Sequence, residues 1–236
     1  MSGLERWQDA ISQNIASSEV SGYKAIGTAM HTQKMPQAEP GKDFATTLGA
    51  ELVKADLSVN RDKGIYIASD NNMDCAIDGD GYFQIRTADG GTKYTRNGHF
   101  QVSKDNVLVN ADGETVAGVS GTITLAPGGG SLSFDQNGRV YQGATQIGQL
   151  KVVSARNEKA LVPINGGFVP SEGTDADMRD IAQPRILQGY FEASNVSPMR
   201  EMVNMITVER AYEANQKVIQ NADTILGNAI QAFSVT

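Results

Sequence analysis

Apolar positions in the C-terminal part of the chain repeat in alternating steps of three and four. This spacing predicts one long helix from Ser197 to Phe233 with an apolar seam along one side. Ser197 can cap this helix, and Pro198 suits its first position. At about 1.5 Å per residue the helix would be roughly 55 Å long, several times the average helix length. The predicted seam consists of Met205, Val208, Tyr212, Asn215, Ile219, Ala222, Leu226, Ala229 and Phe233.

A seam of this length needs a partner helix, which indicates an assembly protein rather than a free-standing enzyme. The alternative is a C-terminal helix that docks on its own domain. The small residues Ala222 and Ala229 favour close helix packing over that alternative. Asn215 on the seam either fixes the register of the helices or is exposed.

A second amphipathic segment, from Gly3 to about Ser18, offers that partner. Its apolar stripe has the same stepping, and it is too short to be stable as an isolated helix. It ends at Ser21-Gly22, where Gly22 is the candidate residue at positive φ. A membrane-surface helix is the alternative, but Arg6 is its one basic residue. The stripe consists of Leu4, Trp7, Ile11 and Asn14, with Ile15 beside it.

The middle of the chain has a different pattern. Residues 75–190 combine short runs of β-forming residues with turn signals such as Asp89-Gly90-Gly91 and Asn97-Gly98, which predicts a β-rich module. We predict an α+β protein: a mainly-β central module, either a sandwich or a distorted barrel, with N- and C-terminal helices that pair as a coiled coil. Predicted strands include Tyr82–Arg86, Lys93–Arg96, Phe100–Val102, Val107–Val109, Thr122–Leu125, Leu132–Phe134, Arg139–Tyr141 and Gln149–Val153.

The predicted organisation has four segments. Residues 1–30 form the N-terminal helix and turn, 31–74 an extended linker, 75–190 the β-rich outer module and 191–236 the long C-terminal helix. Within the linker, Leu48–Leu57 is predicted as either a short helix or an irregular strand.

Composition narrows the possible functions. The chain has 236 residues, a net charge of -7 and an isoelectric point of about 4.9, which argues against nucleic-acid binding. Cys75 is the only cysteine, so the chain cannot form an internal disulfide or a cysteine-based zinc site. We predict no membrane insertion, because no apolar run is long enough to span a bilayer. The N-terminus shows no cleavable signal peptide, which predicts that any export uses another route.

Catalytic and metal sites are weakly supported. Asp74, Asp78 and Asp80 lack the spacing of a calcium loop, and Asp78–Gly81 is better explained as a turn before a strand. The two histidines, His31 and His99, lie in no nucleophile motif. We therefore predict no catalytic residues, no metal and no cofactor. We expect Cys75 to be a buried small hydrophobic residue.

Two other classes of function stay open at this point. One is a secreted carbohydrate-binding or adhesive β module with helical tails, but only 6% of the residues are aromatic. The other is a hydrolase built on the β module, and no convergent set of polar residues is visible for it.

Three segments carry a resemblance to a known family. Gln13–Lys24 (QNIASSEVSGYK) is similar to an N-terminal signature of the bacterial flagellar axial proteins, the rod and hook proteins. Ile77–Phe83 with Tyr94–Phe100 resembles the central signature of that family, and Gly189–Asn215 resembles its C-terminal signature. In the first segment Gln13, Ser17 and Val20 replace the usual Asn, Asn and Thr. Met1–Leu4 matches a point several residues inside the usual N-terminus, which predicts an upstream start or a short helix.

The resemblance implies a structural subunit of the flagellar basal-body rod. The implied partners are other rod and hook subunits and the flagellar export apparatus, which would pass an unfolded chain without a cleaved signal peptide. Both terminal helices would pair in the inner layer of the tube, with the β module outside. The chain is short for a hook protein. The stretch Arg86–Gly90 favours a proximal-rod type, and Glu209–Asn215 is equally similar to the distal-rod type.

Overall fold

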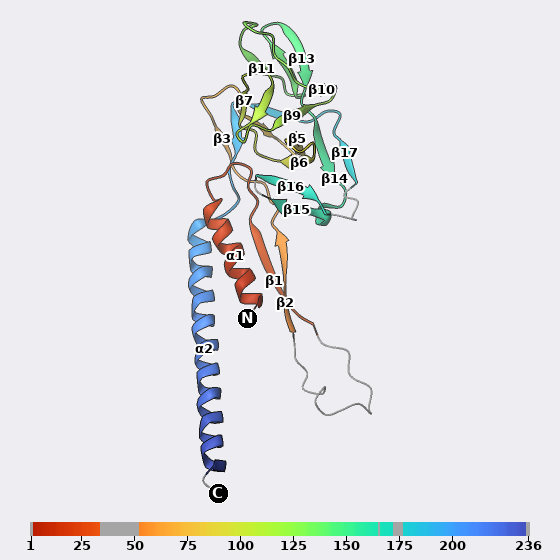
Figure 1. The fold of residues 1–236 in the computed structure, drawn as a ribbon. Coiled ribbons are helices and arrows are strands. Elements are labelled where there is room, and N and C mark those ends of the chain that lie inside the picture. Colours follow the sequence, from red (N-terminus) through yellow and green to blue (C-terminus); the bar gives the residue numbers. More distant parts are fainter. Residues whose placement is uncertain (1, 34–51, 165, 172–176, 235–236) are drawn as a thin grey trace. The chain divides into compact units, whose positions relative to one another are not determined.

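The computed structural model describes residues 2–33, 52–164, 166–171 and 177–234, and the chain divides into two compact units (Figure 1). The helix–hairpin unit comprises Met1–Ala16, Ile26–Asn60 and Val196–Thr236. The β unit comprises Ser17–Ala25 and Arg61–Asn195. Both ends of the chain therefore belong to the same unit, although they are far apart in sequence.

Two α-helices, α1 (Ser2–Ala16) and α2 (Pro198–Ser234), lie side by side in the helix–hairpin unit (Figure 1). Helix α2 has 37 residues, which confirms the prediction of a long C-terminal helix. It begins at Pro198, and the Glu201 N–H donates to the Ser197 carbonyl oxygen at 3.0 Å. Glu201 also places a negative charge in the first turn, where the helix dipole favours it.

A β-hairpin packs beside α1 in this unit. Strand β1 (Ile26–Gln33) pairs antiparallel with β2 (Leu52–Val59), from Ile26 opposite Val59 to Gln33 opposite Leu52. Asn14 fixes α1 to the start of the hairpin, because its Nδ2 donates to the Ile26 carbonyl oxygen and its Oδ1 accepts from the Ile26 N–H, both at 2.8 Å.

Residues 31–74 were predicted as an extended linker, and the described residues of this segment include paired strands. Residues 31–33 end β1, and the segment also contains β2 and β3 (Tyr66–Ala68). The backbone is extended as expected, but it is paired rather than free. Its partners are distant in sequence, so local propensity could not indicate them. Residues 34–51, including the start of the Leu48–Leu57 segment, lie outside the described residues.

The β unit is built on a sheet whose described strands follow the order β15-β16-β6-β5-β9-β8-β7, with β10, β14 and β17 beside this path. A second sheet has the order β11-β12-β13, and the pairs β18-β4 and β19-β3 complete the described sheets. A short 3-10 helix spans Glu158–Ala160. The remaining strands are β4 (Cys75–Ile77), β5 (Tyr82–Arg86), β6 (Thr92–Thr95), β7 (Phe100–Val102), β8 (Leu108–Asn110), β9 (Thr115–Gly118), β10 (Gly121–Thr122), β11 (Leu132–Phe134), β12 (Arg139–Gln142), β13 (Thr145–Gln149), β14 (Val152–Ala155), β15 (Leu161–Ile164), β16 (Gly167–Pro170), β17 (Met178–Asp180), β18 (Ile186–Gln188) and β19 (Tyr190–Glu192).

One apolar core contains residues of the large sheet, of the β11-β12-β13 sheet and of the β18-β4 pair. Phe83 and Phe100 are fully buried at its centre, with ring centroids 5.1 Å apart in an edge-to-face arrangement. Cys75 belongs to this core and is fully buried, as predicted. Burial raises the pKa of its thiol, so the thiol is inert rather than nucleophilic.

The described chain is thus mainly β, with one N-terminal and one C-terminal α-helix and no closed barrel among its described strands. The predicted mainly-β module is confirmed, and the barrel alternative is not found in this part of the chain. No helix within the described residues is both long and apolar enough to cross a membrane.

Candidate assembly interface and buried ionic cluster

The three sequence segments that carry the family resemblance meet inside the β unit. Lys24 comes from the turn that follows α1, Arg96 directly follows β6, and Glu192 ends β19. Their side chains form one ionic cluster (Lys24, Arg96 and Glu192), in which they are 2%, 6% and 0% exposed. The chain therefore brings distant charged residues together at a buried point.

Glu192 is the acceptor at the centre of this cluster. Its Oε1 accepts from Lys24 Nζ at 2.5 Å and from the Gly64 N–H at 2.9 Å, and its Oε2 accepts from Arg96 Nη1 at 2.9 Å. Burial would raise the pKa of the Glu192 carboxyl, but the Lys24 hydrogen bond and the Arg96 charge outweigh it and hold that pKa below its usual range. The carboxylate is therefore ionised at neutral pH.

The two cations have further acceptors. Lys24 Nζ donates to the Asp62 carbonyl oxygen at 2.7 Å, and Arg96 Nη2 donates to the Gly79 carbonyl oxygen at 2.6 Å. The Arg96 guanidinium also lies 5.6 Å from the centre of the Tyr82 ring, within cation–π range. Because every group in the cluster is paired, its burial is compatible with a stable fold.

Gly22 permits the close approach of the N-terminal turn to this cluster. Its φ is +71°, as the sequence predicted, and its N–H donates to the Glu192 carbonyl oxygen at 2.7 Å. A Cβ at this position would lie 2.5 Å from the Arg96 carbonyl carbon and the Asn97 nitrogen. A larger residue would therefore separate the turn from the strand end behind it.

Ser21, His99 and Asp74 form a hydrogen-bonded chain beside the cluster. His99 Nδ1 lies 2.9 Å from Asp74 Oδ1, and His99 Nε2 lies 2.8 Å from Ser21 Oγ. This order resembles a serine nucleophile relay. Ser21, however, is buried, and the next N–H along the chain, that of Gly22, is already bonded to Glu192. These hydrogen bonds therefore tie the turn after α1 to the rest of the β unit. The Gly22 N–H is not available as a donor to an oxyanion.

Asp78–Gly81 forms the predicted turn before β5, with Gly79 and Gly81 at positive φ. In the described residues, no group of three or more His, Cys, Asp or Glu side chains is arranged to hold a metal ion.

The predicted helix seam divides into a covered and an uncovered part. In α1, Ile11 and Asn14 are buried, while Leu4, Trp7 and Ile15 are partly buried. In α2, Val208 is fully buried, Met205 and Tyr212 are partly buried, and the Tyr212 hydroxyl bonds to Glu5 Oε1 at 3.1 Å. The structure thus brings the α1 stripe and the first part of the α2 seam together within one chain.

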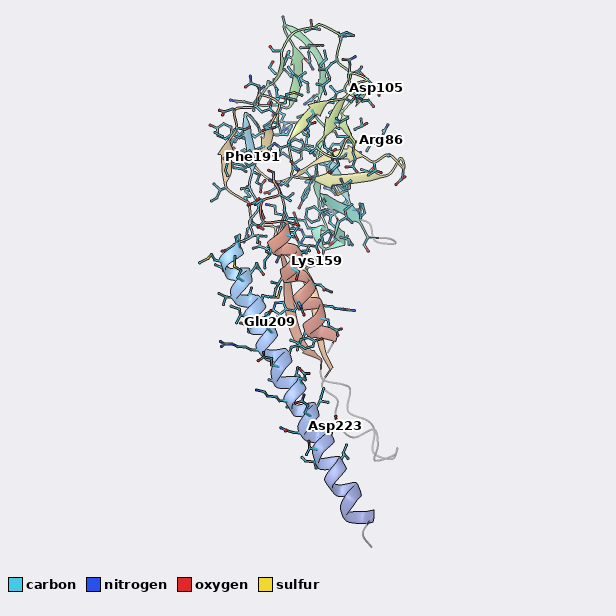
Figure 2. The ribbon with its side chains drawn as sticks, turned by 60° about the vertical axis from the view of Figure 1, so that its left-hand side comes forward. Arg86, Asp105, Lys159, Phe191, Glu209 and Asp223 are labelled. Atoms are coloured by element: carbon cyan, nitrogen blue, oxygen red, sulfur yellow. The ribbon has the colours of Figure 1, made fainter. Side chains whose placement is uncertain are left out.

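After Tyr212, the part of the seam whose burial the structure describes is exposed. Every side chain from Glu213 to Gly227 is exposed, including those of Asn215, Ile219, Ala222 and Leu226. Figure 2 shows α2 continuing past α1, with Asp223 on the part that α1 does not reach. The side chains of Ala229 and Phe233 lie outside the described residues.

Several exposed apolar residues of α2 are not on the predicted seam. They were missed because the prediction followed a single stripe, although apolar residues at spacings of three, four and seven also occur on other sides of the helix. The ionic cluster was also missed, because the sequence cannot pair charges so far apart. The additional exposed residues are Met199, Met202, Val203, Ile206, Val218 and Ile225.

Comparison with known proteins agrees with this architecture. The family model for the flagellar hook protein FlgE/F/G D1 domain matches residues 76–142, and the model for the flagellar basal body rod FlgEFG protein C-terminal region matches residues 187–232. The flagellar basal-body rod protein FlgF of Caulobacter vibrioides is 30% identical over 231 residues, which cover 97% of this chain and 92% of the relative.

The chain belongs to the flagellar basal-body rod family. The flagellar basal-body rod protein FlgG of Buchnera aphidicola subsp. Schizaphis graminum is 31% identical, with 95% of this chain and 94% of the relative covered. FlgG of Agrobacterium fabrum is 30% identical, with 91% and 89% covered. Identity to the two kinds of rod protein is therefore about equal.

Family membership gives the class of function. The chain is a structural subunit of the flagellar basal-body rod and not an enzyme. The Ser21–His99–Asp74 chain is accordingly part of the fold. The role of the individual seam residues in assembly stays a prediction.

Proposed function

We propose that this rod subunit polymerises through α1 and α2, which pair as a coiled-coil segment in the inner layer of the rod while the β unit lies outside. Its partners are other rod and hook subunits, and the polymer transmits torque as a stiff shaft. The observation that carries the proposal is the apolar part of α2 that continues beyond α1, with Ile219 46% and Leu226 60% exposed. Large apolar side chains in such a row are stabilised when another helix covers them.

Assembly in this scheme completes the folding of the subunit. Ile11 and Val208 are already buried within the chain, whereas α2 after Tyr212 gains its contacts from neighbouring subunits. Coupling order to assembly in this way favours growth at the rod over aggregation elsewhere. The single cysteine leaves no internal disulfide to be formed before or after export of an unfolded chain through the flagellar export apparatus.

We further propose that the subunit occupies the proximal rod, because the segment Arg86–Gly90 is more similar to proximal-rod proteins. A tagged chain should restore motility to a strain that lacks its gene. It should also be present in rod intermediates isolated from a strain that makes no distal-rod subunit.

The control is the same tagged chain in a strain with complete basal bodies. Recovery from complete basal bodies, but not from the intermediates, would place the subunit in the distal rod. Recovery from neither would contradict a role in the rod.

A further inference from the structure

The β unit carries a surface hollow of about 190 Å³ on the sheet that contains β5 and β9. It lies beside β5, where β9 pairs with the end of that strand and β14 pairs with its start. The backbone of Lys151 occupies the junction of these strands. Its N–H donates to the Ala117 carbonyl oxygen at 3.0 Å, and its carbonyl oxygen accepts from the Gln84 N–H at 3.1 Å.

Positive charge gathers in this hollow. Arg86, at the end of β5 and labelled in Figure 2, is exposed, whereas the side chain of Ile85 before it is fully buried. Lys151 is the second cation of the lining, and no carboxylate is among the described residues that line the hollow. The amide of Gln84 and the hydroxyl groups of Thr115 and Thr122 add further hydrogen-bond donors. The lining is therefore suited to an anion.

Contacts within the chain do not satisfy these two cations. The Arg86 guanidinium forms no hydrogen bond or ion pair with another described residue. Lys151 Nζ lies 3.3 Å from Asp180 Oδ1, but the two side chains are 29% and 68% exposed. Because an exposed ion pair contributes little to stability, Lys151 can exchange Asp180 for another carboxylate with little loss. Both cations are therefore available to a partner from outside the chain.

We propose that this hollow receives a carboxylate side chain of the adjacent rod subunit, with Arg86 and Lys151 as its two charged contacts. This inference rests on the proposed function. The charge of the chain supports this occupant, because each copy carries 27 Asp and Glu against 20 Lys and Arg, and complementary charges guide partners into register. The planar guanidinium of Arg86 can bind both oxygens of one carboxylate. Such a contact would fix the orientation of one β unit on its neighbour.

Carbodiimide cross-linking of isolated basal bodies tests the contact, because the reagent joins an amine to a carboxylate only where the two groups touch. Lys151 should become linked to another subunit, which gives a larger band on a denaturing gel and a linked peptide by mass spectrometry. The Lys151–Asp180 pair should give an internal link in free and assembled subunits, which shows that the reagent reaches Lys151. Lys151→Arg keeps the charge without the amine, so it should enter rods and lose both links.

Charge reversal tests whether assembly needs the contact. Arg86→Glu combined with Lys151→Glu should lower incorporation into rods at least about tenfold, because like charges that face each other across an interface are strongly unfavourable. Lys104→Glu combined with Arg139→Glu is the matched control, since it changes the net charge equally at two exposed cations outside the hollow. The control chain should enter rods at close to the wild-type level. Urea denaturation should give similar midpoints for both chains.

Each outcome decides the proposal. Rods that contain the wild-type chain but yield only the internal Lys151–Asp180 link would overturn the contact and leave the rod function intact. Normal incorporation of the chain with both charges reversed would do the same. If phosphate then raised the melting temperature of the wild-type chain but not that of the reversed chain, the hollow would bind a free oxyanion instead of a subunit. Absence of the wild-type chain from rods would overturn the proposed function, and the contact with it.

Discussion

Glu192→Gln is expected to lower the free energy of unfolding of the β unit by about 3–5 kcal/mol, the range for breaking a buried ion pair by removing one partner. The amide keeps the size of the side chain but removes the charge between Lys24 and Arg96, both of which are buried. Its NH2 group would also place a donor against a donor at one of these two contacts. Urea denaturation followed by circular dichroism measures the change.

A matched control is Glu158→Gln, because Glu158 pairs with Arg61 but its side chain is 46% exposed. Exposed pairs contribute little, so this variant should lose less than about 1 kcal/mol. Equal losses in the two variants would contradict the view that burial makes the Glu192 cluster important.

The stability that is lost in Glu192→Gln should also depend on pH. The folded-state pKa of Glu192 is lowered, so its stabilisation is present above the pKa of the unfolded chain and is lost as pH falls through the folded-state value. The difference between the wild-type chain and Glu192→Gln should therefore be largest near neutral pH and shrink below about pH 4, where unfolded glutamate becomes protonated. A difference that is constant down to strong acid would show that the loss is not caused by the missing charge.

Leu226→Asp is expected to abolish incorporation into rods while the β unit stays folded. Leu226 is 60% exposed in the single chain, so the substitution costs little before assembly. In the proposed assembly the same position is covered by a neighbouring helix, where an unpaired carboxylate is strongly unfavourable. Isolated basal bodies, probed for the tagged variant, should contain little or none of it, and motility should be lost.

Gln220→Asp is the control for this result. It adds the same charge to the same exposed part of α2 but on another side of the helix, and it should enter rods at close to the wild-type level. Normal incorporation of Leu226→Asp, or equal failure of both variants, would contradict the assignment of this surface.

Local pattern predicted the elements that depend on nearby residues. The long helix was predicted over Ser197–Phe233 and is observed over Pro198–Ser234. The strands Tyr82–Arg86, Phe100–Val102 and Leu132–Phe134 were predicted with the observed bounds. In each case periodicity, or a β-forming run between turn signals, contains enough information to define the element.

The missed elements depend on partners that are distant in sequence. Strand β18 pairs with β4 through Ile186 opposite Ile77, and β19 pairs with β3 through Tyr190 opposite Ala68. Three-residue strands of this kind have little pattern of their own, and their hydrogen bonds define them. The segment predicted as an extended linker contains β2, whose pairing with β1 could not be read from local sequence.

The candidate site was predicted in part. Periodicity located the α2 seam, but it could not divide that seam between contacts inside the chain, such as those of Val208, and exposed positions, such as Ile219. That division depends on where α1 ends against α2, which is a property of the fold. The ionic cluster lies within the motifs that carried the family resemblance. No sequence pattern links its members, because residues 24, 96 and 192 meet only after folding.

Hydrogen–deuterium exchange of α2 in free subunits and in assembled rods would test the central claim most directly. In the free subunit, amides of residues 213–227 should exchange faster than those of 201–212, because α1 packs beside the earlier part of the helix. In assembled rods, residues 213–227 should become protected. Unchanged exchange of these residues in rods that contain the subunit would show that neighbouring helices do not cover this surface, and it would contradict the account.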